Sequence, residues 1–142
     1  MKTSEAGLNL IKSFEGLKLE SYLCPAKVWT IGYGHTQGVK KGQIISEKHA
    51  ESLLKGDLLI YEKAVLSHNL KLNQNQFDAL VSFTYNVGPG NLAKSTLLRK
   101  AKINPDDSTI RDEFMKWDKA KGKTLAGLTR RRKAEADLYF KV

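Results

Sequence analysis

The stretch FEGLKLESYLCPAKVWTIGYGHT, residues 14–36, decides the first part of the fold. In residues 4–15, leading into this stretch, apolar side chains recur three and four apart, which predicts a helix with one apolar face. Gly16, directly after Glu15, offers the left-handed residue that ends many helices. The β-branched and aromatic residues of LESYL and VWTIGYG then predict two strands, with CPAK as the turn of a hairpin between them.

Helical patterns dominate the rest of the chain. GVKKGQIIS is a loop with room for a further short strand, and Ser46 can cap a helix of about twenty residues. Asn73 and Gln76 form a capping-box pattern before the next helix, which NVGPGN ends. Shorter helices are expected at KSTLLRKA, Ser108–Lys119 and Thr129–Phe140. The expected fold is α+β and mainly α, with a small β-hairpin lobe of residues 17–45, a linking helix of residues 46–67 and a larger helical lobe of residues 68–142 plus the N-terminal helix 1–15.

Length and composition limit the possible classes of protein. A chain of 142 residues that is 41% hydrophobic can build the core of one domain. A single cysteine excludes an internal disulfide framework, and three scattered histidines form no metal-binding pattern, so we expect no metal and no cofactor. Charges interrupt every apolar run in residues 1–20, which predicts neither a secretory signal nor a membrane span and favours synthesis in the cytoplasm.

The net charge of +9 is concentrated towards the C-terminus. Residues 94–142 hold 14 Lys and Arg against 7 Asp and Glu, which leaves +7 there. Nucleic acid, an acidic membrane surface or an acidic polysaccharide would all suit this charge, and so would a merely soluble basic surface.

Three residues of the opening stretch could carry chemistry. Glu15 precedes a helix-ending glycine, so its carboxyl projects between helix and sheet, where a partly dry cleft would favour the protonated form that a general acid needs. Thr30 lies on a strand face bordered by glycines, where a hydroxyl could hold a water. Cys24 would be a nucleophile only beside a base, and His35 is the nearest histidine in the sequence. The ordinary alternatives are a solvated acid, a strand former and a small buried side chain.

The spacing of these residues is more specific than any one of them. Glu15, eight residues, Cys24, five residues and Thr30, followed by IGYGHT, resembles the phage lysozyme family, which includes the T-even phage enzyme and the endolysins of lambdoid phages. The family pattern is Glu, eight residues, Asp or Cys, five residues, Thr, and this chain carries the thiol. NQFDALVSFTYNVGPGNLAKSTLLRK resembles the family's central helix and substrate-lining turn, and AGLTRRRKAEADLYF resembles its last helix.

The resemblance implies a lysozyme-like fold and a muramidase that cuts the β-1,4 bond between N-acetylmuramic acid and N-acetylglucosamine. Glu15 would be the general acid and Cys24 and Thr30 would handle the attacking water, with inversion at the anomeric carbon. The implied partner is bacterial peptidoglycan, with no nucleic acid, no stable membrane insertion and a monomeric enzyme. The implied location is the host cytoplasm until a holin-type membrane lesion gives access to the periplasm and the wall.

The resemblance also suggests binding and supporting residues. Tyr85 and Asn86 match positions at the floor of the groove, and Ser95 lies near a further substrate-contacting position. An arginine near Arg130 supports the catalytic glutamate in the family, and His35 is a second supporting candidate. The alternatives are that Tyr85 belongs to the core, that Asn86 caps a helix, and that the arginines form a solvated basic face.

Ion pairs within the last helix are expected from spacing alone. Glu135 lies one turn after Arg131, and Asp137 lies within reach of Arg132 and Lys133. Such partners would compensate the unfavourable placement of cations in the first turn of a helix.

A thiol changes the expected chemistry. A free thiol has a pKa of about 8.5, so a few per cent is thiolate near neutral pH, and an ionised carboxylate nearby would reduce that fraction. We therefore expect Cys24 to orient water or to take its proton late, and Glu15 to matter more. Glu20 shares strand parity with Cys24 and is a competing second carboxylate. The rival functions are a lytic transglycosylase, which needs one acid, and a noncatalytic cationic binder of walls or membranes.

Overall fold

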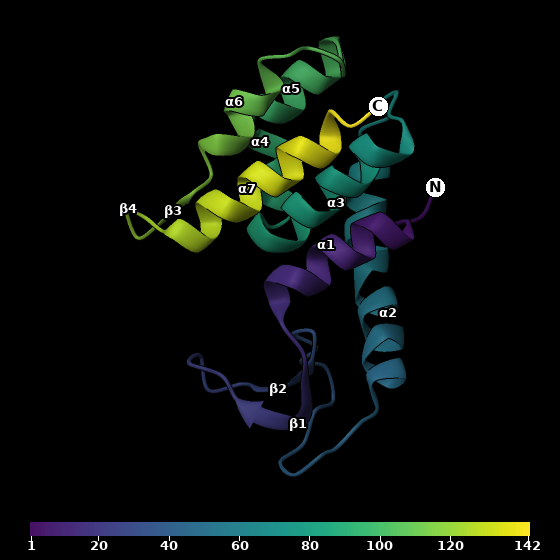
Figure 1. The fold of residues 1–142 in the computed structure, drawn as a ribbon, viewed down its shortest axis with the longest axis vertical. Coiled ribbons are helices and arrows are strands. Elements are labelled where there is room, and N and C mark those ends of the chain that lie inside the picture. The colour runs from purple at the N-terminus through teal and green to yellow at the C-terminus, as the bar shows by residue number, and fades with distance from the viewer. The chain divides into compact units, whose positions relative to one another are not determined.

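Seven helices and four short strands make up the protein, whose computed structural model describes residues 1–142 (Figure 1). The expected class is confirmed, because helices predominate and the hairpin forms. No helix combines the length and the apolar character needed to cross a membrane. In chain order the elements are α1 (Glu5–Glu15), β1 (Lys18–Leu23), β2 (Trp29–Gly32), α2 (Glu47–Leu66), α3 (Gln74–Val87), α4 (Pro89–Lys94), α5 (Thr96–Ile103), α6 (Ile110–Met115), β3 (Lys119–Ala120), β4 (Lys123–Thr124) and α7 (Ala126–Tyr139).

The chain forms two compact units. One consists of residues 11–59, and the other of residues 1–10 together with residues 60–142. The division falls inside α1 and inside the 20-residue helix α2. Each unit is described by itself below.

The smaller unit, residues 11–59, is built around the hairpin. β1 and β2 pair antiparallel, with Tyr22 opposite Thr30. The further strand segment expected in GVKKGQIIS forms as an isolated bridge between Glu20 and Ile44. Strand β1 therefore has a pairing partner on each of its two edges. This pairing fixes the position of the turn that joins β1 to β2.

The larger unit is a helical bundle with an aromatic core. α3 packs on α7, and α7 also packs on α6. Edge-to-face ring contacts join α3, α6 and α7 at centroid separations of 5.6 and 5.7 Å, made by Phe83, Phe114, Trp117 and Tyr139. The predicted capping box at the start of α3 is confirmed, since Asn73 accepts from the Gln76 amide and the Gln76 side chain accepts from the Asn73 amide.

Three boundaries differ from the expected ones. The NVGPGN segment ends α3 at Gly88, whose φ of 96° suits glycine, but Pro89 then begins the short helix α4 because proline is favoured at a first helical position. The helix expected at residues 108–119 forms only over α6, Ile110–Met115. The small β3–β4 hairpin begins at Lys119, where the expected helix was to end. α7 begins three residues before Thr129.

A charged cluster lies inside the helical unit. Arg131 Nε lies 3.2 Å from Glu135 Oε2, which confirms that predicted pair. Arg132 also turns to Glu135, with Nε 2.8 Å from Oε1, so its predicted pairing with Asp137 is wrong. Asp137 instead binds Arg111 of α6 at 2.8 Å. The reason is burial. Arg132 is fully buried, so its charge requires a buried partner, and Glu135 is the buried carboxylate.

Candidate active site

Glu15 is the last residue of α1 and is half-buried. Gly16 follows in the left-handed region with φ of 74°, and its N–H donates to the Lys12 carbonyl at 3.1 Å. The predicted glycine stop is therefore confirmed. A side chain at Gly16 would meet no atom within 4 Å, so the backbone conformation rather than space requires glycine there. The chain leaves the helix directly into β1 and holds the Glu15 carboxyl at the helix–strand junction.

The end of α1 is anchored to the smaller unit by Lys12. Its ammonium group forms an ion pair and hydrogen bond with Glu51 of α2 and lies 5.6 Å from the centre of the Tyr33 ring. The hydrogen bond and charge of Lys12 lower the pKa of the Glu51 carboxyl. This contact links α1 to α2 within residues 11–59 and fixes the helix turn that precedes Glu15.

Cys24 occupies the start of the hairpin turn. The Cys24 N–H donates to the Val28 carbonyl at 3.0 Å, and the Lys27 N–H donates to the Cys24 carbonyl at 2.8 Å. Lys27 has φ of 61°, as expected for the residue that closes such a turn. The thiol is partly exposed, which excludes the alternative of a deeply buried core cysteine.

The turn also surrounds the sulfur with hydrogen-bond donors. The Val28 N–H has the largest effect and lowers the pKa of the Cys24 thiol; burial opposes it, while the Ala26 N–H, the Thr30 hydroxyl and the residue's own N–H lower it further. Backbone N–H groups stabilise an anion at their focus. The pKa of the Cys24 thiol is thus below its ordinary value, which sequence spacing could not show, while the expectation that Cys24 orients water or takes its proton late stays a prediction.

Thr30 shares this environment. It is 5% exposed, it lies on β2, and its hydroxyl donates to the Val28 carbonyl at 3.0 Å. The same hydroxyl hydrogen-bonds to the Cys24 sulfur. A hydroxyl carries one proton, so it donates to one of these two acceptors at a time, and a charged thiolate is the stronger one. The structure therefore brings Cys24 and Thr30 together as a coupled pair.

His35 does not serve as a base for Cys24. Its Nδ1 lies 2.8 and 2.9 Å from the two carboxylate oxygens of Asp57, and its Nε2 lies 2.9 Å from the Gln37 carbonyl oxygen. Both ring nitrogens are therefore engaged by partners other than Cys24. His35 ties the glycine-rich turn after β2 to α2, which is a supporting role.

Tyr85 and Asn86 lie in the last turn of α3, in the larger unit. Tyr85 is half-buried and stacks edge to face on Tyr61 at 5.1 Å, so it is not a fully enclosed core residue. Asn86 is exposed, and the helix cap is Gly88, which excludes the capping alternative for Asn86. Both side chains thus remain accessible for a ligand.

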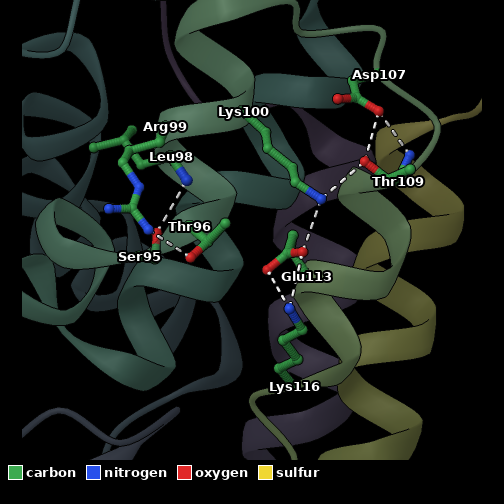
Figure 2. Close-up of polar contacts among 9 residues, drawn as sticks. All are labelled: Ser95, Thr96, Leu98, Arg99, Lys100, Asp107, Thr109, Glu113 and Lys116. Atoms are coloured by element: carbon green, nitrogen blue, oxygen red, sulfur yellow. Dashed lines mark hydrogen bonds and ion pairs between the residues drawn. The ribbon is translucent and has the colours of Figure 1, made fainter.

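Ser95 has a different environment, shown in Figure 2. Its hydroxyl is 3% exposed, accepts from the Leu98 N–H at 3.0 Å and donates to the Leu92 carbonyl at 2.7 Å. These bonds cap α5 and use the hydroxyl proton. The neighbouring Thr96 is more exposed and accepts from Arg99 at 2.8 Å, so any ligand contact here falls on the residues around Ser95.

Arg130 and Glu15 belong to different compact units. Arg130 lies in the first half of α7 and is exposed, whereas Arg131 is 4% exposed and also contacts the Ser82 carbonyl at 3.3 Å. The pairing of Arg130 with Glu15 stays a prediction.

The comparison with known families decides the assignment. The sequence model described as Phage lysozyme matches residues 12–135, which include the hairpin, α2 and most of α7. The chain belongs to the phage lysozyme family.

Other members of the phage lysozyme family cover the whole chain. It is 45% identical over 145 residues to an endolysin of Acyrthosiphon pisum secondary endosymbiont phage 1, with 98% of both chains covered. It is 46% identical to an endolysin of Bacillus phage B103 but spans only 54% of that relative's length.

Solved structures give the same fold. The muramidase domain of SpmX from Asticaccaulis excentricus has a TM-score of 0.89 at 39% identity, and a point mutant of P22 lysozyme has 0.91 at 35%, each covering 99% of both chains. The lysozyme-like fold is confirmed, and with the family match so is the expected class of enzyme, a lysozyme or endolysin.

Two features of this phage lysozyme were missed from the sequence. Asp57, the partner of His35, lies in the middle of α2, where an acid is ordinarily solvated. The N–H donors of Ala26 and Val28 belong to the backbone and leave no side-chain signal. The available clue was the CPAKV turn, since the residue that opens a turn often accepts from amides within it.

Proposed function

We propose that this phage lysozyme is a muramidase that hydrolyses the β-1,4 bond between N-acetylmuramic acid and N-acetylglucosamine, with Glu15 as the general acid. The family match and the muramidase and lysozyme structures at 35% identity and above support this class of reaction. The observation that carries the proposal is the coupled pair of Cys24 and Thr30, nine and fifteen residues after Glu15 and within the same compact unit.

In the proposed mechanism the protonated Glu15 carboxyl donates its proton to the glycosidic oxygen as the bond to the anomeric carbon breaks. A water attacks that carbon from the opposite face, and its proton passes to the Cys24 thiolate. Hydrogen bonds from the backbone of Val28 and Ala26 lower the pKa of the thiol and so favour the thiolate, while the Thr30 hydroxyl turns towards the sulfur or the water. Glu15 ends ionised and Cys24 ends as a thiol, so one proton returns from Cys24 to Glu15 through solvent before the next cycle.

The experiment that tests the reaction class is digestion of purified peptidoglycan in heavy-oxygen water. We expect one heavy oxygen at each new reducing end, and an α-anomer as the first product by NMR because the water attacks from the opposite face. A product lighter by one water, an anhydromuramic sugar without heavy oxygen, would instead establish a lytic transglycosylase. A β-anomer would point to covalent attack by Cys24.

The role of Glu15 has a matched control in Glu20. Glu15→Gln should lower kcat by about 10²–10⁴, the usual contribution of a general acid. Glu20 is exposed, so Glu20→Gln should retain parental turbidity clearing. Activity that survives in Cys24→Ser but is lost in Glu20→Gln would transfer the second catalytic role to Glu20. Lysis by Glu15→Gln at the parental rate would establish a noncatalytic cationic binder.

Arg130 is the proposed electrostatic partner of Glu15. If Arg130 supports Glu15, Arg130→Gln should lower kcat and change its profile against pH. Lys133→Gln is the matched control, because it removes one exposed charge from the same helix. Equal profiles for the two variants would reduce Arg130 to part of a basic surface.

We further propose that the enzyme works as a monomer on bacterial peptidoglycan, is made in the host cytoplasm, and reaches the periplasm through a holin-type lesion. Tyr85 and Asn86, which are accessible at the end of α3, are the proposed sugar-binding residues. Expression in a bacterial host should leave the cells intact until the membrane is permeabilised. Lysis without permeabilisation would show that the chain reaches the wall by another route.

A further inference from the structure

A pocket in the helical unit contains none of the residues assigned to catalysis. It has a volume of about 220 Å³ and is lined by residues 69–71, which follow α2, and by Ala101, Lys102, Ile103 and Pro105 at the end of α5. Both segments belong to the larger compact unit, so the pocket is a feature of that unit alone.

The pocket carries a positive charge that has no acidic partner. Lys71 and Lys102 line it, both are exposed, and neither takes part in an ion pair. Asp106 and Asp107, which follow Pro105, keep their charges but form no ion pair with either lysine, since Asp106 accepts from Gln76 at 2.8 Å and Asp107 accepts from Thr109 at 2.7 and 2.9 Å. An anion entering the pocket would therefore meet two free ammonium groups.

The positive charge of Lys102 also acts on the neighbouring His68. Burial and the positive charge of Lys102 both lower the pKa of His68, which directly precedes the pocket-lining segment.

Apolar side chains stand beside these lysines. Ile103, the residue after Lys102, is 87% exposed, and Leu66, at the end of α2, is 44% exposed. The Asn69 N–H donates to the Leu66 carbonyl at 3.1 Å, so the backbone turns from the end of α2 directly into the pocket-lining segment. Single exposed apolar residues are common, but a group of them mixed with unpaired lysines is typical of surfaces that contact a partner.

We propose that this basic apolar patch, consisting of Leu66, Leu70, Lys71, Lys102 and Ile103, docks on anionic phospholipid. Lys71 and Lys102 would bind a headgroup phosphate at the pocket, while Ile103 and Leu66 enter the interfacial region of the bilayer. A soluble polyanion would use the lysines but gain nothing from the isoleucine, so the combination favours lipid. The proposed docking is peripheral, since it uses side chains of one surface patch.

The experiment is vesicle flotation with the full chain. The parent should float with vesicles that mix phosphatidylglycerol and phosphatidylcholine and should stay unbound with phosphatidylcholine alone. Replacing both lysines, Lys71→Gln with Lys102→Gln, should weaken binding about thirtyfold, which corresponds to about fivefold for each lysine near the surface. Ile103→Ser should weaken it several-fold without changing the net charge.

Two control variants distinguish the effect of the patch on vesicle binding from the effects of net charge and of exposed apolar residues in general. Lys119→Gln with Lys133→Gln removes the same charge from exposed positions outside the patch, and Ile44→Ser removes an isoleucine that is 72% exposed in the other unit. Both controls should bind within about twofold of the parent, because membrane attraction is local to charges near the surface.

Four results would overturn the proposal: no preference of the parent for phosphatidylglycerol, equal losses in the two lysine doubles, parental binding by Ile103→Ser, or displacement of the parent from vesicles by inorganic phosphate. The last would mean that the pocket binds free anions. None of these readouts depends on peptidoglycan cleavage, so the test stands apart from the proposed function.

Discussion

The backbone N–H of Val28 donates a hydrogen bond to the sulfur of Cys24, and this contact does more than any other to lower the pKa of the thiol. The turn that joins β1 to β2 thereby favours the anionic form of the thiol. The consequence is that this position can hold an anion closer to neutral pH than an ordinary cysteine can.

The reactivity of Cys24 should reveal the shift directly. Alkylation by iodoacetamide should reach its half-maximal rate at a lower pH than in a short cysteine peptide, because the thiolate is the reacting form. Thr30→Val should move that midpoint upward, since it removes one donor to the sulfur. Thr36→Val, at an exposed site, should leave the midpoint unchanged. A parental midpoint at or above that of the peptide would contradict the assigned hydrogen bonds.

Replacement of Cys24, the proposed acceptor of the proton from water, should change the pH profile of catalysis. If the Cys24 thiolate takes the proton from water, activity rises as pH rises through the lowered pKa of the thiol. Cys24→Asp keeps an anion at the focus of the same amides, so it should keep activity within about tenfold and shift that rising limb towards acid, since an aspartate has an ordinary pKa of about 3.9. The Cys24→Ser variant should show no such rise of activity with pH. Superimposable profiles for parent and Cys24→Asp would exclude a proton-accepting role.

The buried cluster on α7 should determine much of the stability of the helical unit. Burial raises the pKa of the Glu135 carboxyl, and the charges of Arg132 and Arg131 oppose this. Glu135→Gln would leave two buried guanidinium groups without their counter-charge, so we expect a loss of about 3–5 kcal/mol in the free energy of unfolding. Denaturant titration measures it.

The control for this prediction is the exposed pair on the same helix. Asp137→Asn removes the contact with Arg111, where the two side chains are 56% and 42% exposed, and should cost about 1 kcal/mol or less. Equal losses for Glu135→Gln and Asp137→Asn would show that burial does not set the strength of these pairs.

Much of the fold could be predicted from the sequence because its signals are local. The glycine stop after Glu15, the CPAK turn and the capping box at Asn73 each depend on residues within a few positions of one another, and all three formed. The partner of Arg132 could not be predicted in the same way. Spacing offers Glu135 and Asp137 on one helix, and only burial against α3, which brings Ser82 into the cluster, selects Glu135.

Prediction of the candidate site from the sequence meets the same limit, because sequence spacing does not show three-dimensional contacts. The spacing of Glu15, Cys24 and Thr30 indicated the right family, but the state of the thiol depends on N–H groups that the letters of the sequence do not display. Ser95 matched a substrate-lining stretch, yet the structure uses its hydroxyl as a helix cap. Side-chain identity located these positions, whereas backbone geometry determined what each can do.

The Lys100–Glu113–Lys116 contact between α5 and α6 should make the protein sensitive to acid (Figure 2). Burial alone would raise the pKa of Glu113, but hydrogen bonds and charges from the two lysines, at 2.9 and 3.0 Å, outweigh it and hold the pKa below its ordinary value. A lowered pKa in the folded state means that this stabilisation is complete above the unfolded pKa of about 4.3 and is lost as pH falls through the folded value.

Glu113→Gln should therefore cost about 1–3 kcal/mol at neutral pH, and its free energy of unfolding should fall less than that of the parent between about pH 4 and the lower, folded pKa. Asp112→Asn, which changes the exposed neighbouring carboxylate, should keep the parental acid dependence. Thermal unfolding across that pH window measures both. Parallel curves for the parent and Glu113→Gln would mean that the two lysines do not hold the Glu113 carboxylate in its charged form, and that another carboxyl sets the response to acid.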